Sequence, residues 1–132
     1  MREVEALPPA PLVSERTVSK LLLVIDDEEA FRDSMSAILA LEGFCVKTCS
    51  SRDIALDILT HDTALIIVDW NMPGMKLERF VEVVRQKYGK LPILLFSTAT
   101  DASDAAKALS IPCLAKSAAP RDLISTIRKL SC

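Results

Sequence analysis

Long apolar runs and paired metal-binding residues are missing from this sequence. Its unbroken apolar stretches, such as 21–25 and 64–68, are far shorter than the roughly 20 residues that a membrane-spanning helix needs. The four cysteines include no CxxC pair and are accompanied by a single histidine, which argues against a zinc site or a disulfide framework and favours a reducing cytoplasm. We expect Cys45 and Cys113, which lie in apolar runs, to be small core residues.

An excess of charge of one sign is also missing. The net charge is -2 and both signs are interspersed, so nothing favours a nucleic acid or an anionic membrane as partner. Residues 1–20 mix acidic, basic and proline residues and do not resemble a secretory signal. With 132 residues, 50% of them apolar, the chain is long enough for one domain with a proper core.

Apolar periodicity predicts short strands that alternate with helices. The strands are expected at residues 20–25, 44–48, 65–68, 92–96 and 111–115. The helices are expected before Gly43, from Ser51 or Asp53, at 77–88, at 101–109 and from Pro120. This alternation is typical of a parallel sheet with helices on both faces. Residues 1–19 contain prolines without apolar periodicity, so we expect a flexible N-terminal extension before a domain over residues 20–132.

The stretch 65–75, LIIVDWNMPGM, is the most informative part of the chain. Its apolar, β-branched residues suit a strand buried on both faces, and this strand ends at Asp69. Pro73 and Gly74 then indicate a loop. Asp69 could simply cap the helix that follows, because aspartate is common in such turns. It also stands at the carboxyl end of a parallel strand, where open α/β sheets place their ligand sites.

Polar side chains follow the ends of the first, third, fourth and fifth predicted strands. In chain order they are Asp26 and Asp27, Asp69, Ser97 and Thr98, and Lys116. Since the carboxyl ends of parallel strands lie at one edge of a sheet, we expect these side chains to surround one crevice. Taken singly, Lys116 is more typical of a solvated surface and Ser97 of a capping hydroxyl. Their joint placement is the stronger signal.

The chemistry of this crevice points to a cation and to phosphate. Carboxylates gathered in one crevice repel one another unless a cation joins them. Oxygen ligands without histidine or cysteine favour a hard ion, and Mg²⁺ fits best. A hydroxyl and an ammonium beside that ion could hold the oxygens of a phosphoryl group, and an aspartate can itself accept phosphate as an aspartyl-phosphate.

Successive segments of the chain resemble the signatures of response-regulator receiver domains, the CheY-like family of two-component and phosphorelay signalling. These segments are LLVIDDEEAFR, VDWNMPGM, LPILLFST and CLAKS, and the resemblance covers about residues 20–130. It implies a flavodoxin-like α/β fold, a (βα)5 three-layer sandwich whose five parallel strands lie in the order 2-1-3-4-5. It also implies that Asp69 is the phosphoacceptor, and that Mg²⁺ is bound by Asp26, Asp27, Asp69 and the backbone carbonyl of Asn71.

The residues that would read the phosphate depart partly from the family pattern. The resemblance implies that Lys116 pairs with the phosphoryl group and that Ser97 is the switch hydroxyl, with Thr98 as the alternative. Ser117 replaces the usual proline after Lys116, and a non-proline cis bond costs about 2.5–4 kcal/mol. The sequence therefore leaves open whether the bond is cis, as the family pattern implies, or trans, which would aim Lys116 differently. Cys113 stands where the family often has Tyr or Phe, so no ring can swing inward at this position.

These features predict a receiver domain that a sensor histidine kinase or a phosphotransfer protein phosphorylates on Asp69. It would be cytoplasmic, would not be an enzyme, and would signal to an unknown downstream protein, since the chain ends shortly after its fifth helix. An alternative is a phosphorylation-independent interaction module (a pseudo-receiver), which Cys113, Ser117 and a shortened fourth helix favour. A third is a Mg²⁺-dependent phosphohydrolase of small molecules, but such enzymes typically need a second acid where this chain has Asn71.

Overall fold

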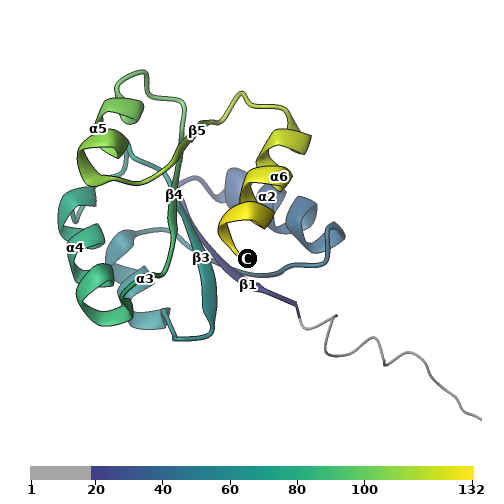
Figure 1. Ribbon diagram of the computed structural model, residues 1–132. Coiled ribbons are helices and arrows are strands. Elements are labelled where there is room, and N and C mark those ends of the chain that lie inside the picture. The colour runs from purple at the N-terminus through teal and green to yellow at the C-terminus, as the bar shows by residue number, and fades with distance from the viewer. Residues whose placement is uncertain (1–18) are drawn as a thin grey trace, which may run out of the picture.

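Parallel strands form a single sheet in the order β2-β1-β3-β4-β5, with helices in the connections (Figure 1). The computed structural model describes residues 19–132. The strands are β1 (Leu21–Ile25), β2 (Cys45–Cys49), β3 (Thr63–Val68), β4 (Ile93–Ser97) and β5 (Cys113–Ala115). The helices are α2 (Glu29–Leu41), α3 (Arg52–Ile58), α4 (Leu77–Tyr88), α5 (Ala102–Leu109) and α6 (Pro120–Leu130). The predicted alternation and strand order are confirmed.

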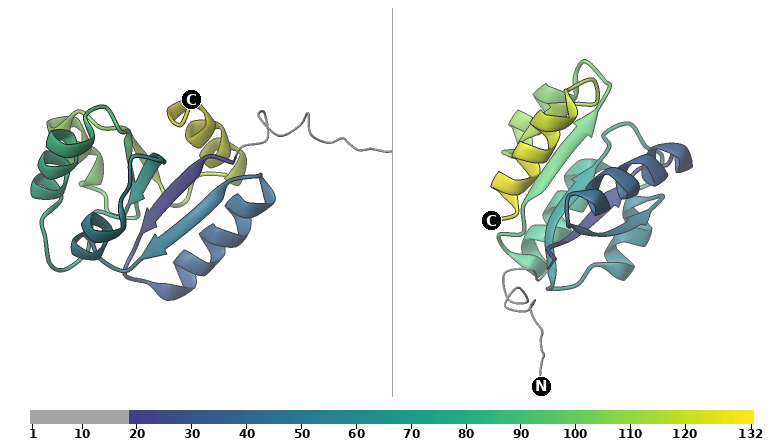
Figure 2. Two further views of the ribbon diagram at one scale, coloured as in Figure 1. Left: turned by 90° about the horizontal axis from the view of Figure 1, so that it is seen from below. Right: turned by 90° about the vertical axis from the view of Figure 1, so that its right-hand side faces the viewer.

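The helices cover both faces of the sheet, as Figures 1 and 2 show. On one face, α2 and α6 pack on a cluster made of Leu22, Val24, Met35, Leu39, Leu65, Ile67, Leu94, Phe96, Leu123 and Ile127. On the other face, α3, α4 and α5 cover a cluster that includes Leu23, Ile25, Ala55, Ile66, Val68, Phe80, Val84, Leu95 and Ala106. Because successive strand residues point to opposite faces, the central strands β1, β3 and β4 are buried on both, which explains their unbroken apolar runs.

The prediction that Cys45, on the edge strand β2, is a core residue is wrong. Cys45 is exposed and is not a core residue, because at the edge of the sheet the helices leave alternate positions uncovered. Cys49, at the other end of the same strand, is buried, and Cys113 on β5 is half-buried. All four cysteines are free thiols.

The boundaries of β5 and its neighbours differ slightly from the predicted ones. β5 is shorter than expected because Pro112 has no N–H to donate, although its carbonyl accepts the Leu95 N–H at 3.0 Å. The bond between Lys116 and Ser117, whose isomer the sequence leaves open, is trans, since residues 19–132 contain no cis peptide bond. The predicted extension over residues 1–19 lies, apart from Ser19, outside the described residues. None of the helices in the described part of the chain combines the length and apolar character that crossing a lipid bilayer requires.

Candidate functional site: an acidic pocket at the carboxyl edge of the sheet

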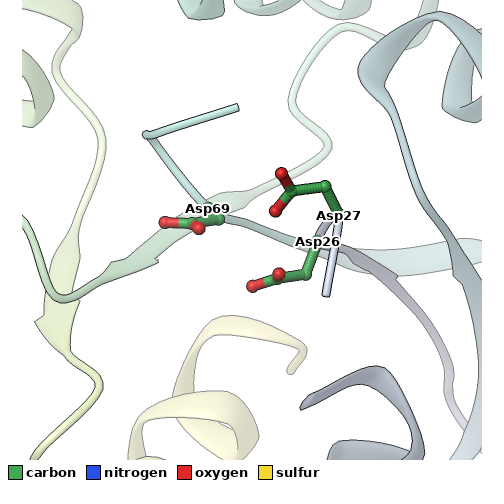
Figure 3. A group of neighbouring side chains, drawn as sticks. All are labelled: Asp26, Asp27 and Asp69. Carbon is green, nitrogen blue, oxygen red and sulfur yellow. The ribbon is translucent and has the colours of Figure 1, made fainter. Parts of the chain in front are cut away.

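Aspartate side chains from two neighbouring strands meet at the carboxyl edge of the sheet (Figure 3). Asp26 directly follows β1 and Asp69 directly follows β3, and these strands are paired with Ile25 opposite Val68. The Asp69 N–H donates to the Ile25 carbonyl at 3.1 Å, so the strand pairing continues to the site itself. One carboxylate oxygen from each of Asp26, Asp27 and Asp69 lies within 4.8 Å of the other two.

The pocket carboxylates differ in their access to solvent and in their partners. Asp26 is 1% exposed and Asp69 is 9% exposed, whereas Asp27 lies at the surface. The Oδ1 atom of Asp26 accepts the Glu28 N–H at 2.9 Å. The Oδ1 atom of Asp69 is buried and has no hydrogen-bond partner among the described residues. A buried carboxylate oxygen without a donor is unfavourable, so this atom is available to a ligand that enters the pocket.

Lys116 places its ammonium group among these carboxylates. Its Nζ atom lies 2.6 Å from Asp26 Oδ2 and 3.5 Å from Asp69 Oδ2. The residue directly follows β5, and its N–H donates to the Ser97 carbonyl at 3.1 Å, which holds its backbone to the end of β4. The same Nζ atom lies 3.9 Å from the centre of the Phe31 ring, a cation–π contact that orients the ammonium. Lys116 is therefore a pocket residue and not a solvated surface lysine.

The donor set of the pocket fits a hard divalent cation. It consists of carboxylate oxygens without histidine or cysteine, which suits Mg²⁺ better than zinc. Asp69 belongs to this group, and its Oδ1 atom is buried and has no donor among the described residues. Asn71 is exposed in the loop two residues beyond Asp69, and the role of its carbonyl as a further ligand stays a prediction.

The two candidate switch hydroxyls lie at the same edge of the sheet. Ser97 is the last residue of β4 and is buried, and its Oγ atom accepts the Ala99 N–H at 3.2 Å. This contact matches the capping role that a serine in such a turn often has. Thr98 is exposed. Which of the two hydroxyls reads a phosphoryl group stays a prediction.

The sequence analysis missed one residue beside the pocket, Arg52. Ser51 caps α3 by accepting the Ile54 N–H at 3.1 Å, so Arg52 is the first residue of the helix. Its side chain turns inward and is only 2% exposed. An arginine in the first turn of a helix normally lies in solvent, and no pattern in the sequence distinguishes this one.

The guanidinium of Arg52 binds the backbone that follows the phosphoacceptor candidate. One terminal nitrogen donates to the carbonyls of Asp69 at 2.7 Å and Trp70 at 2.8 Å, and the other donates to the Met75 carbonyl at 2.8 Å. Burial lowers the pKa of Arg52 from its ordinary value, and the charges of Asp69 and Glu78 partly oppose this effect. Arginine nevertheless stays protonated in proteins, so a fixed positive charge lies behind this loop.

A protein-family comparison and the curated relatives of this chain point to the same family. The family described as response regulator receiver domain matches residues 22–128. The chain is 32% identical to the transcriptional regulatory protein CpxR homolog of Haemophilus influenzae over 117 residues, which cover 86% of this chain and 50% of that protein. The chain spans about half or less of the length of the first curated relatives that it matches.

Solved structures with the same fold include two response regulators. The chemotaxis response regulator CheY4 of Vibrio cholerae has a TM-score of 0.73 and 28% identity, with 86% of this chain and 99% of that chain covered. The response regulator TrrA of Thermotoga maritima has a TM-score of 0.74 and 26% identity, with 84% of this chain and 98% of that chain covered. The chain therefore belongs to the response regulator receiver domain family of two-component signalling.

Proposed function

We propose that this domain accepts a phosphoryl group on Asp69 from a phosphohistidine of a sensor histidine kinase or a phosphotransfer protein. The observation that carries the proposal is the Asp69 carboxylate, which lies in one group with the carboxylates of Asp26 and Asp27. Its Oδ1 atom is buried and unpartnered, and its Oδ2 atom lies 3.5 Å from the Lys116 ammonium. Membership of the receiver family supports phosphoryl transfer from a partner protein to this domain. It also argues against a small-molecule phosphohydrolase.

The chemistry follows from the side chains of the pocket. A carboxylate oxygen of Asp69 attacks phosphorus and forms the O–P bond, while the P–N bond breaks and its electron pair stays on the imidazole, which takes up a proton. Mg²⁺, when held by Asp26, Asp27, Asp69 and the Asn71 carbonyl, supplies positive charge beside the transferring group. Lys116 then holds an oxygen of the aspartyl-phosphate, because its ammonium already lies 3.5 Å from Asp69 Oδ2.

Two further observations support the setting of this reaction. The structure of the related TrrA is a complex with Mg²⁺–BeF, which supports Mg²⁺ as the cation of the proposal. The free thiols of this chain agree with a reducing, cytoplasmic location. The downstream partner is a protein whose contact with the domain changes on phosphorylation.

One observation favours a second function, an interaction module that works without phosphorylation. Lys116 lies closer to Asp26 than to Asp69, so the pocket already contains a counter-charge that does not depend on phosphate. Cys113 and Ser117, which replace residues usual in the family, point in the same direction.

Phosphorylation of the protein by a small phosphodonor separates the two functions. Wild-type protein incubated with acetyl phosphate and Mg²⁺ should gain the mass of one phosphoryl group, and Asp69→Asn should gain none, because the amide is not a nucleophile. Asp62→Asn, a matched change of an exposed aspartate, should be labelled like the wild type. Equal labelling of the wild type and Asp69→Asn contradicts the assignment of Asp69, and an unlabelled wild type supports the interaction module.

A further inference from the structure

The side chain of Arg52 joins the two ends of the loop that follows Asp69. It donates to the Asp69 and Trp70 carbonyls, where the chain leaves β3, and to the Met75 carbonyl, just before α4 begins. These contacts connect α3 to a loop that is 17 to 23 residues away in the sequence. A single buried guanidinium therefore fixes both ends of the segment that contains Asn71.

Besides the bonds from Arg52, the side chains of Trp70, Met72 and Met75 pack against the core, but the loop backbone has few hydrogen bonds of its own. Pro73 has no N–H to donate, and Gly74 has a φ of 92°, a conformation that other residues rarely adopt. The backbone bond recorded inside the loop runs from the Met72 N–H to the Trp70 carbonyl at 3.1 Å. The loop and the start of α4 border a pocket of about 310 Å³ of which Arg52 forms one wall, so the loop is not packed tightly on that side.

The start of α3 also packs closely on the same loop. A Cβ atom added to Gly74 would lie 3.1 Å from Asp53 Oδ2, which is tighter than most real contacts. Arg52 and Asp53 thus approach neighbouring parts of the loop from one helix turn. A buried carbonyl that loses its hydrogen-bond donor destabilises the local structure, so the loop depends on Arg52 to satisfy its acceptors.

We propose that Arg52 is a positioning residue for phosphotransfer, which sets the Mg²⁺ affinity of the pocket by holding the backbone on both sides of Asn71. This inference rests on the proposed function, because it concerns the same metal and the same aspartate. Arg52 contacts neither the carboxylate oxygens of Asp69 nor those of Asp26, so it acts through the backbone and not as a metal ligand. Partners that lie one layer outside a metal site commonly change its affinity about 10–100-fold when they are removed.

The test compares Arg52→Met, which keeps an unbranched apolar side chain but no donors, with Arg52→Lys. Arg85→Met is the matched control, since Arg85 also donates to a backbone carbonyl, that of Leu109 at 2.7 Å, but lies at the surface in the last turn of α4. The probe is Mg²⁺ alone, titrated while Trp70 fluorescence is followed, together with amide hydrogen exchange of residues 70–76 in EDTA. Acetyl phosphate labelling is then measured over a range of Mg²⁺ concentrations.

Arg52→Met should weaken Mg²⁺ binding about tenfold or more, and residues 70–76 should exchange faster even in EDTA. Its labelling should need correspondingly more Mg²⁺ but reach the wild-type rate at saturation, because the nucleophile is intact. Arg52→Lys should lie between the two proteins, since an ammonium cannot present the planar fork that reaches separate carbonyls. Arg85→Met should bind Mg²⁺ like the wild type.

Wild-type Mg²⁺ affinity in a folded Arg52→Met protein overturns the inference alone, provided that the wild type binds Mg²⁺ and is labelled. A lower rate at saturating Mg²⁺ with an unchanged half-saturating concentration also overturns it. A wild type that binds no Mg²⁺ overturns the proposed function and the inference together. If Arg52→Met does not fold, Arg52→Lys decides: a raised half-saturating Mg²⁺ concentration supports the inference, and an unchanged one contradicts it.

Discussion

The ammonium of Lys116 lies 0.9 Å closer to Asp26 than to Asp69, at 2.6 Å from the first carboxylate and 3.5 Å from the second. The candidate phosphate-binding lysine is thus paired most closely with an expected metal ligand. Its charge competes with a divalent cation for Asp26, and the same charge lowers the repulsion among the pocket carboxylates. This relationship makes the consequences of removing Lys116 depend on Mg²⁺.

The first prediction is that Lys116→Met destabilises the fold strongly only when Mg²⁺ is removed. The pair is mostly buried, with 13% of the Lys116 and 2% of the Asp26 side chain exposed, and removing one partner of such a pair costs about 3 kcal/mol. In EDTA the free energy of unfolding should therefore fall by about this amount, and Mg²⁺ should restore most of it and bind more tightly than in the wild type. Urea unfolding measures both effects, with the exposed Lys107→Met as control. A loss of the same size with and without Mg²⁺ would count against competition for Asp26.

The second prediction concerns Mg²⁺ and the unmodified protein. Because the pocket carboxylates repel one another, Mg²⁺ should bind the folded state and stabilise it by mass action, by about 2.7 kcal/mol at 100 times its Kd. Trp70, next to Asp69, should report the binding through its emission. Asp26→Asn should weaken both responses, whereas Asp62→Asn should preserve them. A thermal midpoint and a Trp70 emission that are both indifferent to millimolar-scale Mg²⁺ would contradict an active pocket.

The third prediction is about the route by which phosphorylation is reported. Cys113 is too small to transmit the signal by ring rotation, so we expect beryllofluoride to change hydrogen exchange more in residues 99–109 than in 111–115. The coupling should lie near the lower end of the usual range of about 1–3 kcal/mol. Ser97→Ala should reduce the response and Thr98→Ala should not, if the buried hydroxyl is the switch. A response centred on Cys113 with α5 unchanged would mean that β5 carries the signal.

The fourth prediction uses the buried thiol of Cys49. Burial raises the pKa of this thiol above its ordinary value, while a backbone hydrogen bond with Ser51 and the charge of Arg32 oppose the shift. The folded state therefore keeps the proton at a pH where the unfolded state has lost it. The resulting stability is complete below the ordinary thiol pKa of about 8.5–9 and declines as the pH rises through the raised value of the folded state.

Urea unfolding under reducing conditions at about pH 7 and about pH 9.5 checks this dependence. The stability lost between the two pH values should be smaller in Cys49→Ala than in the wild type, because the variant lacks the titrating thiol. Cys45→Ala changes an exposed cysteine of the same strand and should show the wild-type loss. An equal loss in Cys49→Ala and in the wild type would exclude a contribution from Cys49.

The strand order and the residues of the acidic pocket could be predicted from the amino-acid pattern and the family resemblance alone. The apolar runs of β1, β3 and β4 are long enough to identify, and each ends at a polar residue. Parallel strands put their carboxyl ends at one edge, so Asp26, Asp69 and Lys116 were expected on the same edge of the sheet whatever the details of helix packing. Such strands can be recognised from the sequence because burial on both faces requires apolar residues at nearly every position.

Which surfaces are covered and which pocket side chains touch depends on packing between segments that are distant in the sequence. Cys45 is exposed because β2 lies at the edge of the sheet, a position that periodicity along one strand cannot specify. Arg52 turns inward because α3 docks beside the loop after β3 and offers it unpaired carbonyls, a contact between segments distant in the sequence. The Nζ atom of Lys116 lies less than one ångström closer to Asp26 than to Asp69, and this difference depends on how the side chain passes over the Phe31 ring. Distances on that scale arise from packing between elements, and no sequence pattern encodes them locally.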